Sequence, residues 1–284
     1  MKMSEFKNHP LLLIGFLFFL VFGVGKLPVK EYLSLSKSYS DNVESIFIYS
    51  SLIFISVFII NKLSIPHSYF YAIKYKKYIF YLPVIVYIFV FTNGFADYFT
   101  INSSTFYSWK TAILGIKTLS SGLFEEILFR GLILGILLYN FYDSKRGILK
   151  SVIISSLIFG LIHIVNIWTE NQTVKGSFNQ VYAAFCLGVM YSAVYLKTGS
   201  IIILGVLHSI SNFFASISEL VEPGSIIYSL STEKTVVEII ISNVLILIIF
   251  GLPLVIGLCI LKQTNKRDIA HIIQKPSFSA EVAR

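Results

Sequence analysis

The sequence is poor in charged residues. Asp, Glu, Lys and Arg make up 13% of the 284 residues, against about 25% in soluble domains, whereas hydrophobic residues make up 55%. The mean hydropathy of +0.76 over the full length leaves little sequence for a separate water-soluble domain. We therefore predict an all-α integral membrane protein, with residues 1–284 forming a single polytopic domain in the cell membrane.

Cysteine is also scarce. The two cysteines, Cys186 and Cys259, lie in apolar runs and have no Cys-x-x-Cys partner. This excludes a disulfide framework and a cysteine-based metal site, and we interpret both residues as small apolar fillers. The sequence has no detectable internal repeat and no His-Glu-x-x-His motif.

The positive charge has no features of nucleic-acid binding. The net charge is +8, but no aromatic-interleaved basic groove or nucleic-acid motif accompanies it. Lys and Arg instead form short clusters between apolar runs, where such residues contact anionic lipid and set topology. The clusters lie in alternate loops and at both ends of the chain, so we expect both termini on the cytoplasmic side and the lipid bilayer, not nucleic acid, as a partner.

Apolar runs predict about eight transmembrane helices. The first is interpreted as an uncleaved helix because no Ala-x-Ala-like site follows it. Residues 30–44 are expected to form a loop, and residues from about 262 to 284 a polar tail. The fourth helix is long enough to be tilted or to contain an interfacial turn near 117–120. The expected helices are 11–24, 43–60, 79–95, 109–139, 147–168, 178–196, 200–217 and 236–261.

Three ionisable side chains interrupt the fourth apolar run: Glu125, Glu126 and Arg130. Each costs roughly 2.5–3.5 kcal/mol to place in a bilayer, so we expect them to pair, to face water or to do chemistry. Glu126 and Arg130 are four residues apart, a favourable spacing for an ion pair on one helix face, whereas Glu125 points about 100° away. We therefore predict that Arg130 compensates Glu126 and that Glu125 remains available. Gly122 and Gly131 flank the pair and would allow another helix to approach closely.

Polar side chains on two other predicted helices belong to the same pattern. A lone intramembrane histidine is explained equally well by a hydrogen bond across a helix interface, but polar groups on three helices normally face a shared interior. His208 and Asn212 are one turn apart and offer two donors at one point, as an oxyanion requires. Glu125 and His163 are suited to bind and deprotonate water. The predicted reaction is water attack on an amide.

The polar residues resemble the motifs of a known family. Its members, the CAAX protease and bacteriocin-processing (CPBP, or Abi) intramembrane endopeptidases, carry three motifs in a fixed order on separate membrane helices. Each motif alone is weak, whereas the ordered coincidence over about residues 110–217 is specific. In this sequence the motifs read Glu125-Glu126-x-x-x-Arg130, Phe159-x-x-x-His163 and His208-x-x-x-Asn212.

The resemblance implies eight membrane helices around a polar, conical catalytic cavity. It implies that Glu125 and His163 activate water and that His208 and Asn212 stabilise the oxyanion. The implied substrate is a membrane-associated or prenylated protein or peptide, and prokaryotic members are linked to bacteriocin immunity or peptide processing. The family resembles metal-independent glutamic proteases, so no cofactor is expected.

Three alternatives remain open at this stage. Glu125, His163 and His208 could ligate zinc with an open coordination position. The chain could instead be a catalytically silent membrane scaffold or immunity protein. A transporter also places carboxylates and histidines at mid-membrane, but it usually shows repeats, and here the polar cluster occupies one half of the sequence only.

Overall fold

The computed structural model describes residues 9–25, 37–63, 75–91, 109–169, 173–220, 236–264 and 266–269. All regular structure in these ranges is helical, which confirms the predicted all-α class. The α-helices are α2 (Pro10–Gly25), α3 (Lys37–Lys62), α4 (Leu82–Phe91), α7 (Trp109–Glu126), α8 (Leu134–Phe141), α9 (Lys145–Ile162), α10 (Asn166–Thr169), α11 (Val174–Thr198), α12 (Ile201–Ala215), α13 (Val236–Lys262) and α14 (Lys266–Ile269). The remaining segments are the 3-10 helices η3 (Tyr75–Tyr81), η5 (His163–Val165) and η6 (Ile217–Leu220) and the π-helix η4 (Ile127–Ile133).

Each predicted helical range contains a helix, but two details of the prediction are wrong. Residues 37–42, expected in a loop, belong to α3. Residues 117–120, where an interfacial turn was an option, continue α7 without a break. Both errors have one cause: hydropathy marks the part of a helix that meets apolar surroundings, whereas an established helix propagates through polar residues at one hydrogen bond per residue.

The helices have the length and composition of membrane spans. Among the residues that the structure describes, four stretches are long and apolar enough to cross a bilayer: 41–62, 145–165, 174–198 and 244–262. The apolar helices at 78–90 and 201–215 are shorter. Large apolar side chains also lie exposed on the outside, such as Phe19 at 78% and Phe54 at 75%. Together these features make the chain a membrane protein, and the count of eight crossings stays a prediction.

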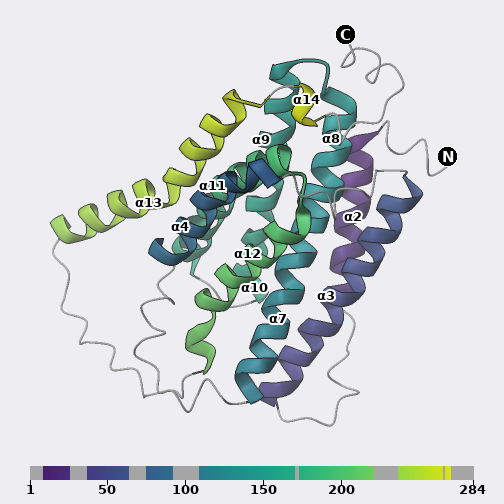
Figure 1. Ribbon diagram of the computed structural model, residues 1–284. Coiled ribbons are helices and arrows are strands. Elements are labelled where there is room, and N and C mark those ends of the chain that lie inside the picture. The colour runs from purple at the N-terminus through teal and green to yellow at the C-terminus, as the bar shows by residue number, and fades with distance from the viewer. Residues whose placement is uncertain are drawn as a thin grey trace.

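The arrangement centres on α7 and α11 (Figure 1). α7 packs against α3 on one side and α12 on the other, while α11 packs against α9 and α13. α13, in yellow-green, lies at the edge of the bundle, and its N-terminal end projects away from the other helices (Figure 1). The π-helix η4 continues α7 and contacts α3, α8, α9 and α12, so it lies inside the bundle.

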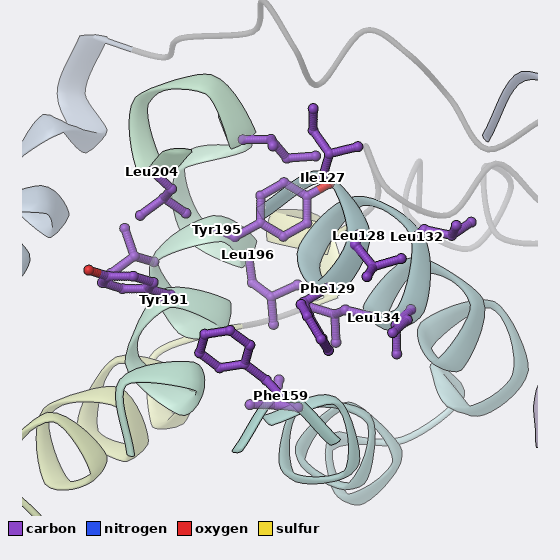
Figure 2. Close-up of a cluster of buried hydrophobic side chains, with 14 of the residues drawn as sticks. Ile127, Leu128, Phe129, Leu132, Leu134, Phe159, Tyr191, Tyr195, Leu196 and Leu204 are labelled. Carbon is purple, nitrogen blue, oxygen red and sulfur yellow. The ribbon is translucent and has the colours of Figure 1, made fainter. Parts of the chain in front are cut away.

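The core surrounds η4. All seven residues of η4 are buried. Figure 2 shows Phe129 of this segment beside Phe159 of α9, and Leu128, Leu132 and Tyr195 belong to the same cluster of buried side chains. Any polar group on η4 is therefore enclosed by packed side chains from several helices.

Glycines allow α7 and α12 to approach closely. A Cβ atom at Gly122 would lie 2.7 Å from the backbone nitrogen of Ser209, and one at Gly205 would lie 2.7 Å from Leu123 Cδ2. The Ser209 hydroxyl donates to the Gly205 carbonyl at 2.6 Å and also lies 3.3 Å from the Leu119 carbonyl oxygen across the interface. The close approach predicted at Gly122 is confirmed. At Gly131 the nearest neighbour of a Cβ atom would be only the end of a side chain, 3.1 Å away.

We expect Gly122→Ala to lower the free energy of unfolding by about 1–3 kcal/mol, because the added methyl group forces the α7 and α12 backbones apart. Gly115→Ala is the matched control on the same helix, since nothing lies within 4 Å of a Cβ atom there. Denaturation of both variants in detergent micelles measures the difference. Equal stability of the two variants would contradict the close packing.

The C-terminal segment contacts the core. Lys197, in the last turn of α11, donates to Asp268 Oδ2 at 2.8 Å and to the Gln263 carbonyl at 2.5 Å. α11 ends at Thr198 and is followed by Gly199, whose φ of 76° is the left-handed conformation that favours glycine. Part of the predicted polar tail is thus helical and attached to α11. The chain termini, and with them the predicted cytoplasmic orientation, lie outside the described residues.

Candidate active site

The structure brings the three motifs together at the junction of α7 and η4. Glu125 and Glu126 are the last two residues of α7, and Arg130 lies in η4. His163 begins η5 directly after α9, and His208 and Asn212 lie on α12. The prediction placed His163 inside a helix that continued to residue 168, whereas the structure places it at the change from α-helix to 3-10 helix.

Glu126 is the centre of a buried polar cluster. Its Oε1 atom lies 2.9 Å from Arg130 Nη1 and 2.8 Å from His208 Nδ1. Glu126 is 0% exposed, and Arg130 only 1%. The ion pair expected from the four-residue spacing is present. The contact with His208 was not predicted, because these residues are 82 positions apart and no local pattern connects them.

Glu125 has a different environment. Its side chain is 18% exposed, and its Oε2 atom lies 3.6 Å from His208 Nε2. The two ring nitrogens of His208 therefore face the two glutamates, one each. Glu126 is fixed by two short contacts, whereas Glu125 keeps access to a reacting molecule. The carboxylates are not equivalent.

Aromatic rings hold Arg130 and link the histidines. The Arg130 guanidinium carbon lies 4.5 Å from the centre of the Phe159 ring and 5.4 Å from that of Tyr191. Such contacts favour a planar, weakly hydrated cation in an apolar core. The Phe159 ring in turn lies 5.4 Å from the His163 ring and 6.0 Å from the His208 ring. Tyr191 was missed because it occupies an ordinary apolar stretch of α11.

Asn212 is held against α7. Its Nδ2 atom donates to Ser121 Oγ at 3.3 Å, and the Ser121 hydroxyl donates to the Thr118 carbonyl. Ser121 precedes Glu125 by one turn, so the carboxamide lies beside the same helix as the glutamates. An amide nitrogen carries two hydrogens, and the bond to Ser121 uses one of them. Sequence reasoning missed Ser121, because a serine in an apolar helix is most simply bonded to its own backbone.

Several buried polar atoms in this cluster lack a direct partner. Among the residues that the structure describes, Glu126 Oε2, Arg130 Nε, Arg130 Nη2 and Tyr191 Oη make no hydrogen bond. Buried groups of this kind are usually satisfied by ordered water. The inner side of the cluster thus has the polar character that water requires, within an otherwise apolar core.

The alternative zinc set does not assemble. In the described ranges, no three His, Cys, Asp or Glu side chains are grouped as metal ligands would be. Glu125, His163 and His208 therefore do not form a ligand cluster as they stand.

Comparison with known proteins finds a family that is similar to the part of the chain carrying the cluster. Residues 107–214 match the family described as Rce1-like, type II CAAX prenyl endopeptidase. This stretch is Rce1-like. Over these residues the match confirms the resemblance that the three motifs indicate. No curated protein and no solved structure matches the chain.

The Rce1-like segment coincides with the part of the fold that carries the site. It starts just before α7 and ends at the last turn of α12. Every residue of the polar cluster falls within it, from Ser121 to Asn212. The helices α2, α3, α4 and α13 lie outside the match and pack around this segment.

Proposed function

We propose that this protein is an intramembrane endopeptidase that hydrolyses a peptide bond in a membrane-associated protein or peptide. The observation that carries the proposal is the position of His208, whose two ring nitrogens face Glu125 and Glu126 in a cluster balanced by Arg130. An ion pair that only stabilises the fold needs one acid and one base, and has no use for a second carboxylate and a histidine beside it. General acid–base catalysis of amide hydrolysis does use such groups, because it needs side chains that accept and donate protons.

In this proposal Glu125 is the general base, acting with His163. Glu125 is the more exposed carboxylate and makes the looser contact with His208. It takes a proton from water as the water oxygen bonds to the substrate carbonyl carbon. The proton then passes to the leaving amine as the C–N bond breaks, which regenerates the carboxylate.

His208 and Asn212 are proposed to stabilise the oxyanion. Because Glu126 accepts a hydrogen bond from His208 Nδ1, the Nε2 atom is a donor only when the ring is protonated. A protonated His208 together with Arg130 gives two positive charges against the two glutamates. The cluster is then neutral, and His208 Nε2–H and the second N–H of Asn212 are the available donors.

The proposed substrate is anchored in the bilayer, as a prenylated C-terminus would be. The matched family is described as a CAAX prenyl endopeptidase, and the exposed apolar surface of the bundle suits a lipid-embedded anchor. We propose eight crossings with cytoplasmic termini, and a cytoplasmic approach for the substrate. Peptide processing and bacteriocin immunity remain proposed roles for the same reaction.

The test is hydrolysis by the purified, full-length protein in liposomes. A farnesylated CAAX peptide and its unmodified form are incubated with wild-type protein and with Glu125→Ala and His208→Ala variants, and products are identified by mass spectrometry. We expect cleavage by the wild type only, and faster cleavage of the farnesylated peptide. If both variants retain full biological function at normal membrane levels, the protein acts as a scaffold and the protease proposal is wrong.

We expect hydrolysis to be insensitive to metal chelators. The proposed mechanism uses only carboxylate, imidazole and carboxamide groups. Incubation with EDTA or 1,10-phenanthroline should leave the rate of cleavage unchanged, and active protein should contain no stoichiometric zinc. Loss of activity with chelator, restored by added zinc, would contradict this prediction.

A further inference from the structure

The π-helix η4 carries one member of the buried ion pair and directly follows the other. It begins directly after Glu126 and includes Arg130. The Phe129 carbonyl accepts from the Leu134 backbone N–H, five residues ahead, where an α-helix would use the residue four ahead. Such π-helical turns are rare and occur frequently at functional sites. η4 is such a segment, and it separates Glu126 from α8.

Ser155 on α9 binds the same carbonyl. Its hydroxyl donates to the Phe129 oxygen at 3.2 Å, although the two residues are 26 positions apart. Ser155 is 1% exposed, so no solvent competes for this bond. The Phe129 carbonyl therefore accepts two hydrogen bonds, one from its own helix and one from α9.

The contact forms part of a larger attachment of α9 to η4. Phe159, one turn after Ser155, lies 4.9 Å ring to ring from Phe129 and 4.5 Å from the Arg130 guanidinium. Ser155 fixes the backbone at Phe129, while Phe159 covers the neighbouring side chains. Both residues lie on the same face of α9, since they are four positions apart.

The hydrogen-bond register at Phe129 determines where Arg130 points. The four-residue spacing of Glu126 and Arg130 suits an α-helix as well, but a return to α-helical register would rotate Arg130 relative to α9 and α11, whose Phe159 and Tyr191 rings hold its guanidinium. Glu126 Oε1 is also the partner of His208 Nδ1. A change of register would thus also alter the position of the His208 ring, which faces Glu125.

We propose that Ser155 is a positioning residue, which keeps η4 in π-helical register so that the Arg130–Glu126–His208 chain stays aligned for hydrolysis. Its effect on turnover rests on the proposed function. Its effect on the register does not, and the two can be measured separately.

The neighbouring Ser156 supplies a matched control. It is also 1% exposed and on α9, but its hydroxyl makes no hydrogen bond within the described part of the chain. We expect Ser155→Ala to reduce kcat about tenfold or more with little change in KM, since small displacements in an active site reduce rates by up to about 10²-fold. Ser156→Ala should stay near wild type, and Ser155→Thr, which keeps the hydroxyl, should recover most of the rate.

The register itself is tested by NMR on the full-length protein in micelles. Phe129–Arg130 is the only Phe-Arg pair in the sequence, so carbonyl-13C phenylalanine combined with 15N arginine labels this peptide bond uniquely. We expect Ser155→Ala to move the Phe129 carbonyl resonance and the Arg130 guanidinium resonances. Ser156→Ala should move neither.

The outcomes separate the two proposals. Unchanged resonances in Ser155→Ala would overturn the positioning role, as would shifted resonances with kcat fully retained. If the wild-type protein cleaves no peptide, the proposed function fails. The role of Ser155 in positioning Arg130 would then be tested by the guanidinium resonances alone. They must still move in Ser155→Ala and stay unchanged in Ser156→Ala.

Discussion

Glu125→Gln is expected to abolish peptide hydrolysis while the protein stays folded. The substitution keeps the size of the side chain and removes the group that takes the proton from water. Loss of a general base reduces rates by roughly 10²–10⁴-fold. Because Glu125 is partly exposed and 3.6 Å from its nearest partner in the cluster, stability should change little. Initial rates in liposomes and thermal unfolding in micelles measure the two effects.

The neighbouring carboxylate, Glu126, provides the control for Glu125→Gln. Glu126→Gln changes the neighbouring carboxylate in the same way, but at a position that makes two short contacts. We expect partial activity and lower stability there, the opposite balance to Glu125→Gln. An active Glu125→Gln protein beside an inactive but stable Glu126→Gln protein would reverse the assignment of the two carboxylates.

The second large effect is on stability. Glu126→Gln should lower the free energy of unfolding by about 3–5 kcal/mol, because it leaves Arg130 buried without its counter-charge. Arg130 is 1% exposed, so water cannot replace the lost carboxylate at the surface. Chemical denaturation of the purified protein in micelles gives the difference from wild type.

A double variant identifies the cause. Glu126→Gln combined with Arg130→Met removes both charges and fills the space with an apolar chain, which for buried pairs is often neutral or stabilising. The double variant should be more stable than Glu126→Gln alone, yet less active than wild type because His208 loses the carboxylate that orients it. If the two substitutions instead destabilise additively, the loss in Glu126→Gln does not come from an unpaired Arg130.

The sequence was sufficient to predict the elements whose signals are local. Long apolar runs predicted the places of the helices, and the four-residue spacing predicted the Glu126–Arg130 pair. The π-helix was not predictable, because residues 127–133 are buried on all sides and show no periodicity that distinguishes one helical register from another. The start of α3 at residue 37 was missed because its first turns are polar.

The parts of the site that depend on tertiary contacts were also beyond the sequence. The three motifs indicated which residues belong together, and the structure places them around the α7–η4 junction. No spacing in the sequence predicts that His208 contacts both glutamates. Nor does any spacing predict the contacts of Ser121 with Asn212 and of Tyr191 with Arg130. Each of these contacts joins residues from different helices, and only packing determines them.

The most direct measurement of the central claim is comparative peptidomics of membranes from cells that carry wild-type protein or Glu125→Ala. The account predicts at least one membrane-associated protein whose cleaved form is present in wild-type membranes and absent, with the uncleaved form accumulating, in the variant. The mass of the product also gives the position of the cut. Identical peptide profiles, with both proteins inserted at equal levels, would contradict an intramembrane endopeptidase that uses Glu125 as its base.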